Sequence, residues 1–412
     1  MRYGLIGRKL KHSFSGELHR ALAGYEYGLF ELEPEEIAHF IRSPGFGGLN
    51  VTMPYKITVY ELCDSLAPSA KRTGCVNTIT YGANGMITGH NTDYDGFLYM
   101  MDRANIRMEG RKVLILGSGG AARSASAAAA SRGAAWVRTV SRGGVYHYGN
   151  LSLNRESEII INATPAGMYP DNGTRPVNLE DFPFCVGVAD LVYNPLRTRL
   201  VRQAESLGIP RCGGLPMLAA QAKYAAELFL GKTLPEERIR IAASKVQRMA
   251  ENIVLVGMPG CGKTSVGRTL AALTGRQFWD SDEAVESAAG KTIERIFAQD
   301  GEAAFREMER AALMDASKHG GRVIATGGGS VLDKLSASEL KQNGRVYHIE
   351  RDILSLAVKG RPLSTDLSSL YAERAPVYQA VADGVVLNNQ SIELAARAIK
   401  ELYDEYIDSQ WA

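Results

Sequence analysis

One segment of the sequence has the residue types and spacing needed to hold phosphate. Residues 257–264 (GMPGCGKT) fit the pattern G-x-x-x-x-G-K-[ST] and follow the apolar run Ile253–Val256. In this pattern backbone N–H groups surround phosphate oxygens, the lysine reaches the β- and γ-phosphates, and the threonine hydroxyl can bind Mg²⁺. The segment predicts a nucleotide site formed by Gly260, Cys261, Gly262, Lys263, Thr264 and Ser265.

Carboxylates and arginines follow this loop in a fixed order. Asp280 and Asp282 end a predicted strand and should face the loop, and the plain structural interpretation of Asp280 is a helix N-cap. Further along stand Arg306, the glycine triplet 327–329, residues 360–363 (GRPL) and residues 373–378 (ERAPVY). The loop alone indicates a nucleotide, whereas the later motifs are the ones that indicate a reaction.

The order of these motifs resembles shikimate kinase over nearly all of residues 250–390. The resemblance implies that Asp282 binds ring hydroxyls of shikimate and acts as the base, with Asp280 and Thr264 on the Mg²⁺ side. A guanidinium matches a carboxylate with two parallel hydrogen bonds, and two arginines would hold the substrate carboxylate in this way. The remaining implied roles are backbone contact with the ring at Gly328, charge balance on the transferring phosphoryl group at Arg361 and Lys263, and the carboxylate clamp at Arg306 and Arg374.

The predicted lid departs from the family pattern. Only residues 351–360 separate Glu350 from Arg361, which is fewer than is typical, and the second lid arginine has no clear counterpart. Lys359 could replace it as a point charge. We therefore expect weaker ATP binding or looser closure, with the chemistry intact.

A second glycine-rich turn lies in the first half of the chain. Residues 117–121 (GSGGA) follow the apolar run Val113–Leu116 and resemble a dinucleotide fingerprint, although Gly120 comes one place early. The next predicted strand, Trp136–Val140, is followed by Arg142, where an NAD enzyme usually has an acid for the ribose 2′-hydroxyl. An arginine suits a 2′-phosphate, so we expect NADP(H). The alternative is that Arg142 is a plain surface residue.

Short polar residues recur at predicted strand ends in the first 100 residues, in the motifs HSFS (12–15), NVTMPYK (50–56), GCVNT (74–78) and HNTD (90–93). Together with NATPAGM (162–168), DLVY (190–193) and GLPMLAAQ (214–221), they resemble shikimate dehydrogenase over residues 1–240. The resemblance implies that Lys56 and Asp93 are the catalytic pair. Hydride delivery to a ketone leaves an alkoxide, and a lysine held by a carboxylate can donate the proton it needs.

The same resemblance implies two further sets of contacts. The substrate would be held by Ser13, Ser15, Thr52, Asn77, Asp93, Tyr193 and Gln221. The cofactor would be held by Gly117, Gly119, Gly120, Ala121, Arg142, Thr164, Gly214 and Met217. Lys9 and Gly16 replace prolines that are usual in the family, which could loosen the substrate loop, and Ser141 replaces an asparagine of the cofactor motif.

Strand, glycine turn and helix recur three times, which is the βα unit of a parallel sheet covered on both faces. The predicted fold class is therefore α/β: a substrate domain and a Rossmann-type NADP domain, followed by a P-loop domain like those of nucleoside monophosphate kinases. We expect the substrate domain in residues 1–102, completed by helices in about 215–245, and the NADP domain in residues 103–214. A charged linker is predicted at 231–251, and the kinase domain at 252–412.

Composition excludes several classes of protein. Hydrophobic residues make up 45% and charged residues 22%, which argues against wholesale disorder. The 47 basic and 45 acidic residues leave no excess for nucleic-acid binding, and no apolar run approaches the ~20 residues that span a bilayer. The five cysteines are scattered and the N-terminus does not resemble a secretory signal, so we expect a cytoplasmic protein.

These patterns predict a bifunctional enzyme that reduces 3-dehydroshikimate with NADPH and then phosphorylates shikimate with ATP and Mg²⁺. One alternative is an NAD-preferring quinate/shikimate dehydrogenase fused to a P-loop kinase for another small acid. Another is a regulatory ligand-binding protein, which the intact Lys56, Asp93, Lys263 and Asp282 argue against. The expected partners are small-molecule substrates, without nucleic acid or membrane, and the sequence does not predict the oligomeric state.

Overall fold

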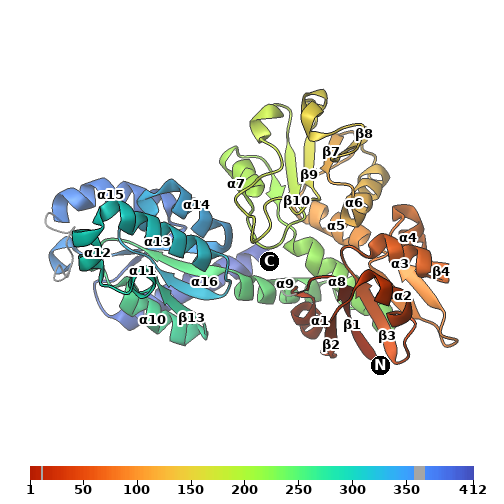
Figure 1. Cartoon of the computed structure of the whole chain (residues 1–412), viewed down its shortest axis with the longest axis horizontal. Coiled ribbons are helices and arrows are strands. Elements are labelled where there is room, and N and C mark those ends of the chain that lie inside the picture. The colour runs from red at the N-terminus through yellow and green to blue at the C-terminus, as the bar shows by residue number, and fades with distance from the viewer. Residues whose placement is uncertain (11–12, 357–366) are drawn as a thin grey trace. The chain divides into compact units, whose positions relative to one another are not determined.

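The chain folds into two compact units, Met1–Val246 and Gln247–Ala412. The structure is a computed structural model, and it describes residues 1–10, 13–356 and 367–412 (Figure 1). Lys359 and Arg361, both predicted for the lid, lie outside the described residues. Within the described ranges, no helix is both long enough and apolar enough to cross a membrane.

The first unit opens with a six-stranded mixed sheet in the order β2-β1-β3-β5-β6-β4. Its strands are β1 (Arg2–Gly7), β2 (Tyr27–Glu31), β3 (Phe46–Val51), β4 (Ser65–Leu66), β5 (Thr78–Tyr81) and β6 (Ile87–His90). The helices among them are α1 (Ser15–Ala23), α2 (Ile37–Phe40), α3 (Lys56–Leu62) and α4 (Pro68–Thr73). β5 and β6 form an antiparallel hairpin, and Gly85 adopts φ +77° in its turn.

A second sheet of the first unit is wholly parallel, in the order β11-β10-β9-β7-β8. Its elements are β7 (Lys112–Leu116), α6 (Gly120–Ser131), β8 (Trp136–Val140), β9 (Ile159–Asn162), β10 (Gly187–Asp190), α7 (Arg199–Ser206) and β11 (Arg211–Cys212). Because the strands are parallel, the loops that follow β7, β9 and β10 gather at one edge of the sheet, where ligands bind in open α/β folds.

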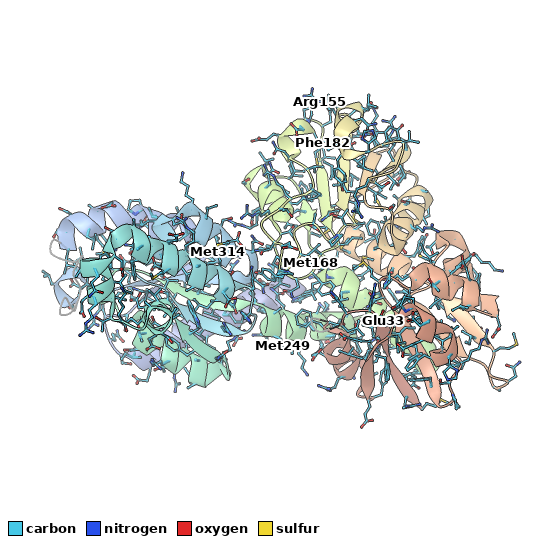
Figure 2. All side chains as sticks on the ribbon, viewed as in Figure 1. Glu33, Arg155, Met168, Phe182, Met249 and Met314 are labelled. Carbon is cyan, nitrogen blue, oxygen red and sulfur yellow. The ribbon has the colours of Figure 1, made fainter. Side chains whose placement is uncertain are left out.

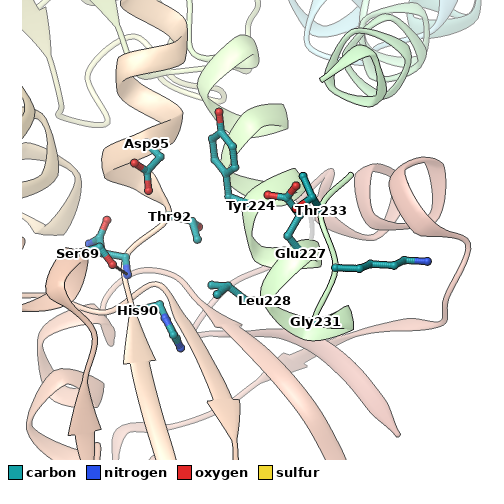
Figure 3. A pocket seen from close by; sticks show the side chains of 11 residues that line it. Ser69, His90, Thr92, Asp95, Tyr224, Glu227, Leu228, Gly231 and Thr233 are labelled. Carbon is teal, nitrogen blue, oxygen red and sulfur yellow. Dashed lines mark hydrogen bonds between the residues drawn. The ribbon is translucent and has the colours of Figure 1, made fainter. Parts of the chain in front are cut away.

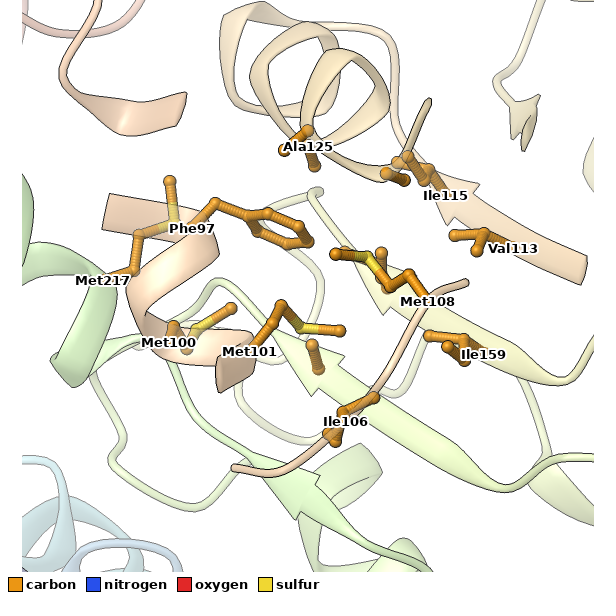
Figure 4. Close-up of a cluster of buried hydrophobic side chains, with 14 of the residues drawn as sticks. Phe97, Met100, Met101, Ile106, Met108, Val113, Ile115, Ala125, Ile159 and Met217 are labelled. Carbon is orange, nitrogen blue, oxygen red and sulfur yellow. The ribbon is translucent and has the colours of Figure 1, made fainter. Parts of the chain in front are cut away.

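Two helices connect these sheets, α5 (Asp93–Arg103) and α8 (Leu215–Leu230), and they cross closely because Gly96 of α5 lies against the backbone of Met217. Phe97, Met100 and Met101 of α5 are buried in the cluster that also contains Met217 (Figure 4). The flexible methionine side chains fill the irregular space between helix and sheet. Asp93, at the N-terminus of α5, is therefore held by a helix that packs into this core.

The second unit contains one parallel sheet in the order β13-β14-β12-β15-β16. Its strands are β12 (Asn252–Val256), β13 (Gln277–Asp280), β14 (Arg322–Ala325), β15 (Gly344–Glu350) and β16 (Gly384–Leu387). Its helices are α10 (Lys263–Thr274), α11 (Ser281–Ala289), α12 (Ile293–Gln299), α13 (Gly301–Ser317), α14 (Lys334–Asn343), α15 (Leu367–Val381) and α16 (Ile392–Trp411).

The glycine-rich loop 257–262 follows the central strand β12 and leads into α10, as predicted. Helix α9 (Glu237–Ala250) precedes β12, and the boundary between the two units falls near its end. Within the second unit, Gln247 accepts a hydrogen bond from the buried indole of Trp411 at 2.7 Å. Side chains fill the space between sheet and helices in both units (Figure 2).

Candidate active sites

Lys56 and Asp93 form a close ion pair in the first unit. Lys56 Nζ lies 2.6 Å from Asp93 Oδ2, and the two side chains are 15% and 7% exposed. Each residue begins a helix that follows a strand of the first sheet, Lys56 at the start of α3 and Asp93 at the start of α5. The N-terminus of a helix is a favourable place for a carboxylate. The pair can therefore hold a proton donor in one orientation, close to solvent but largely enclosed.

Asn77 joins the predicted substrate contacts around this pair. Its side-chain oxygen accepts a hydrogen bond from Thr92 N at 2.7 Å, and its Nδ2 donates to Thr92 Oγ1 at 3.0 Å and to Gln221 Oε1 at 3.4 Å. Thr92 directly precedes Asp93, and Gln221 lies on α8. Thr52 is half-buried at the end of β3, four residues before Lys56. The structure thus brings Asn77 and Gln221 together beside Asp93.

Ser13 and Ser15 lie at the start of α1 and face one another, with their hydroxyl oxygens 3.1 Å apart. The ring of Phe14, between them in sequence, is 6.1 Å from the ring of Tyr193. Tyr193 follows β10 in the second sheet. The predicted carboxylate serines and the predicted tyrosine contact therefore lie on neighbouring segments, although they are 178 or more residues apart in sequence.

The dinucleotide loop lies directly against Lys56. A Cβ on Gly120 would come 3.0 Å from Lys56 Cδ, whereas a Cβ on Gly119 would meet nothing within 4 Å. Gly119 is the N-cap of α6, so the unpaired N–H groups of the first helical turn, at Gly120 and Ala121, border this open space. Gly117 adopts φ +120° against the backbone of Ala163. The loop fits a pyrophosphate next to Lys56.

Arg142 is exposed just beyond the carboxyl end of β8. This strand end lies beside the dinucleotide loop, because Gly117 N donates to Val140 O at 2.8 Å. This is where the ribose of a dinucleotide would lie. A guanidinium at this point fits a 2′-phosphate and offers no acceptor for a 2′-hydroxyl.

The other predicted cofactor residues lie on the loops after β9 and β10. Thr164 donates from Oγ1 to Asn162 Oδ1 at 2.6 Å. Gly214 begins α8 so close to the carbonyl of Leu191 that a Cβ would be 2.3 Å from it. Met217 is 7% exposed and belongs to the core cluster under α5. Thr164 and Gly214 thus border the loop edge, and Met217 packs mainly into the core.

A pocket of about 400 Å³ lies apart from these residues. It opens between β6, α5 and the end of α8, and Asp95 and Tyr224 project into it (Figure 3). Its lining includes Asn91 and Thr92, the neighbours of Asp93, but none of the described site residues predicted from the sequence.

The phosphate loop of the second unit is held by its own lysine. Lys263 Nζ donates to Gly257 O at 2.8 Å and to Met258 O at 3.0 Å. Thr264 Oγ1 donates to Asp280 Oδ2 at 2.8 Å, and Asp280 Oδ1 caps α11 by accepting from Asp282 N at 3.0 Å. The structure shows Asp280 as the N-cap of α11, and its role on the metal side stays a prediction. The Thr264–Asp280 pair offers the oxygen donors that Mg²⁺ prefers.

Asp282 lies close to other acids. Burial raises its pKa to about 6, the nearby Asp280 and Glu309 add to the rise, and Lys263 opposes it. A carboxyl group with this pKa is matched to proton transfer near neutral pH. Glu309 is buried and accepts a hydrogen bond from Ser330 Oγ. The arrangement suits a general base.

The glycine triplet is the point at which the predicted substrate residues meet. A Cβ on Gly327 would be 3.0 Å from Asp282 Oδ1, and one on Gly329 would be 2.5 Å from an Arg306 nitrogen. Gly328 O accepts from the hydroxyl of Tyr378, one turn beyond Arg374 on α15. These close approaches leave no room for side chains at the triplet.

The two arginines differ in their surroundings. Arg306 donates to Glu309 at 2.8 Å and faces Glu302 at 3.2 Å, so acids already neighbour its guanidinium. Arg374 is 7% exposed, and its Nε has no hydrogen-bond partner in the described part of the chain. A buried guanidinium nitrogen without a partner fits the approach of an anionic ligand.

Three residues that hold these sites received no role from the sequence, although one of them, Asp190, begins the DLVY motif. Glu309 binds Arg306, and Asn388 donates from Nδ2 to Cys261 O at 2.8 Å in the phosphate loop. Asp190, in the first unit, is fully buried beneath the loop that carries Thr164. Glu309 stands three residues after Arg306, a spacing that brings side chains together on a helix and was available as a signal. Asn388 offered no comparable local signal.

Comparisons with known proteins agree with this geometry. A shikimate kinase model matches residues 259–407, and a model of the shikimate dehydrogenase substrate binding domain matches residues 5–79. A shikimate dehydrogenase (NADP(+)) from Methanopyrus kandleri is 37% identical over 272 residues, which cover 58% of this chain and 93% of that protein.

Solved structures resemble the first half. Shikimate 5-dehydrogenase from Thermus thermophilus, in complex with NADP(H) and shikimate, superposes with a TM-score of 0.54 and 30% identity, covering 60% of this chain and 99% of that one. Quinate dehydrogenase from Corynebacterium glutamicum, in complex with NAD, has a TM-score of 0.54 and 25% identity, covering 59% of this chain and 98% of that one.

Proposed function

The chain belongs to the shikimate dehydrogenase family over its first unit and carries a shikimate kinase domain in its second, and on this premise we propose two consecutive reactions. The first reduces 3-dehydroshikimate to shikimate with NADPH, and the second transfers the γ-phosphoryl group of ATP to the 3-hydroxyl of shikimate. The observation that carries the proposal is the Lys56–Asp93 pair beside Gly120 in one unit, together with Asp282 beside the phosphate loop in the other.

In the first unit, Lys56 donates the proton that the reduced carbonyl oxygen requires. NADPH, when bound, supplies the hydride. Asp93 holds Lys56 Nζ at 2.6 Å and orients it, while Asn77 and Gln221 are placed to bind substrate hydroxyls. Ser13 and Ser15 hold the substrate carboxylate, and Thr52 and Tyr193 complete the set. In this proposal residues 1–102 and the helices of about 215–245 bind the substrate, and residues 103–214 bind the cofactor.

NADP preference rests on Arg142. Between Arg103 and Arg142 the sequence contains eight basic residues and one acid, Glu109. Four of the eight form ion pairs with Asp102, Glu156 or Glu158, so the exposed Arg142 is the residue proposed to attract the additional negative charge of NADPH. Gly117, Gly119, Gly120 and Ala121 would hold the pyrophosphate, and Thr164, Gly214 and Met217 the nicotinamide side.

In the second unit, Asp282 accepts the proton from the attacking hydroxyl. Lys263 and Gly260–Ser265 hold the nucleotide phosphates, and Thr264 and Asp280 supply Mg²⁺ ligands. Arg306 and Arg374 bind the carboxylate of shikimate, and Arg361, outside the described residues, balances charge on the transferring group. The hydroxyl produced in the first reaction is the nucleophile of the second.

The test supplies the purified chain with 3-dehydroshikimate, NADPH and ATP–Mg²⁺ and follows shikimate and shikimate 3-phosphate. We expect Lys56→Ala to abolish formation of shikimate, and Lys263→Ala to let shikimate accumulate. Normal reduction by Lys56→Ala would show that this lysine does not have the proposed role.

A second candidate is an NAD-preferring quinate/shikimate dehydrogenase fused to a kinase for another small acid, which the likeness to the NAD-bound quinate dehydrogenase keeps open. Rates with NADH against NADPH, and with quinate against shikimate, separate the two.

All five cysteines are free thiols, which suits a reducing compartment, and we place the protein in the cytoplasm with small molecules as its partners.

A further inference from the structure

Asp190 is a fully buried carboxylate at the carboxyl end of β10 to which neither proposed reaction assigns a role. It accepts three hydrogen bonds: from Asn162 Nδ2 at 2.9 Å, from Val192 N at 3.0 Å and from Thr198 Oγ1 at 2.6 Å. A buried carboxylate is costly unless donors satisfy it, and here donors arrive from three separate segments. Asp190 therefore ties these segments to one point.

The first segment is the loop after β9. Asn162, which donates to Asp190, accepts through Oδ1 from Thr164 N at 3.0 Å and from Thr164 Oγ1 at 2.6 Å. Its Nδ2 also donates to Ala166 O at 3.1 Å. Asp190 thus supplies one of the four hydrogen bonds that fix the orientation of the Asn162 amide. The position of Thr164 follows from that orientation.

The second segment is the loop after β10, which carries Tyr193. Val192 donates its N–H to Asp190 and accepts through its carbonyl from Gly214 N at 3.0 Å. Gly214 begins α8, the helix of Gln221. The third segment is the start of α7, where Thr198 both donates to Asp190 and caps the helix by accepting from Val201 N at 3.3 Å. Hydrogen bonds thus link the carboxylate of Asp190 to the segments that carry Thr164, Tyr193 and Gly214.

We infer that Asp190 is a positioning residue of the dehydrogenase, which fixes the loops 162–167 and 191–193 and the start of α8 in the arrangement that receives the nicotinamide end of NADPH. The inference rests on the proposed function. Loops that are already ordered lose less conformational freedom when a ligand binds, so loss of the carboxylate weakens cofactor binding without removing any direct contact. Loss of the Asp190 carboxylate should affect cofactor binding more than the Lys56–Asp93 pair, because Lys56 and Asp93 lie on other elements.

The test is titration of the whole chain with NADPH, followed by the fluorescence of the nicotinamide. We expect Asp190→Asn to weaken NADPH binding at least about tenfold, because an NH₂ group replaces one of the two accepting oxygens and the hydroxyl of Thr198 loses its acceptor. KM for NADPH should rise more than kcat falls. Phosphorylation of added shikimate should keep its normal rate, since it uses the second unit. Asp181→Asn, at an exposed carboxylate of the same sheet region, is the matched control and should bind NADPH normally.

A second pair of variants guards against misfolding. Thr198→Val removes one donor to Asp190, whereas Thr198→Ser keeps it, so NADPH binding should weaken only in the valine variant. Unchanged NADPH affinity in Asp190→Asn, with only a lower unfolding temperature, would overturn the inference and leave the proposed reaction standing. Failure of the unmodified chain to bind NADPH would overturn the proposed function, and the inference with it.

Discussion

The side chain of Lys56 packs against the backbone of Gly120, so that a Cβ on Gly120 would lie 3.0 Å from Lys56 Cδ and 3.2 Å from Lys56 Cβ. Lys56 begins α3 beside the first sheet, and Gly120 begins α6 beside the second. Because Asp93 already holds the other end of Lys56, the stem of the lysine has little freedom to move away. The absence of a side chain at Gly120 lets the dinucleotide loop lie directly against Lys56.

Replacement of Gly120 by alanine should slow reduction of 3-dehydroshikimate. The added methyl group displaces the Lys56 stem by a few tenths of an ångström or more, and small misplacements of a catalytic group can cost up to about 100-fold in rate. We expect kcat to fall roughly 10- to 100-fold in Gly120→Ala, measured from NADPH consumption at saturating substrate. Gly173→Ala, where the new Cβ meets nothing within 4 Å, should retain the normal rate. A fully active Gly120→Ala enzyme would contradict the close contact.

The kinase reaction should fail on the acid side of neutrality. The pKa of Asp282 is raised to about 6, so the carboxylate is protonated below that pH and cannot accept the hydroxyl proton. We expect kcat for shikimate phosphorylation to be level above pH 7 and to fall about tenfold per pH unit well below 6. The measurement is a pH–rate profile at saturating ATP–Mg²⁺. Asp282→Asn should lose activity at every pH, and a profile level down to pH 4.5 would rule out Asp282 as the base.

Asn388 should affect nucleotide affinity through the phosphate loop. It is 5% exposed, and its Nδ2 donates to Cys261 O while the backbone of Gly262 passes next to it. Loss of the partner of a buried carbonyl costs about 1–3 kcal/mol, so Asn388→Ala should raise KM for ATP roughly 5- to 150-fold. Gln390→Ala, at an exposed position two residues later, serves as the control. Equal KM values for the two variants would show that the loop does not depend on Asn388.

Trp411 should stabilise the second unit. It is 7% exposed near the end of α16, and its indole N–H donates to Gln247 at 2.7 Å. Trp411→Ala should lower the free energy of unfolding of this unit by about 3–5 kcal/mol, whereas Trp411→Phe should lose less because much of the packing remains. Urea unfolding monitored through kinase activity checks that the alanine variant loses more stability than the phenylalanine variant. A loss below about 1 kcal/mol in the alanine variant would contradict the burial.

Local patterns were enough to predict the parallel sheets and both glycine-rich loops. Each depends on residues that are near one another in the chain: a buried strand, a turn that requires glycine and a helix that follows it. Lys56 and Asp93 were predicted from the resemblance of the NVTMPYK and HNTD motifs to shikimate dehydrogenase, and not from such a pattern. The lid prediction at Lys359 and Arg361 came from the resemblance to shikimate kinase, and it stays a prediction because both residues lie outside the described ranges.

The amino-acid sequence by itself determined which chemistry-bearing residues stand at strand ends and helix starts, because period, turn residues and capping are short-range properties. Only the tertiary structure decided which of them meet: Lys56 with Gly120, Asp190 with Asn162 and Thr198, and Asn388 with Cys261. These contacts join segments up to 127 residues apart. Their geometry depends on how sheets and helices pack around a shared core, and a pattern along the chain does not encode such packing locally.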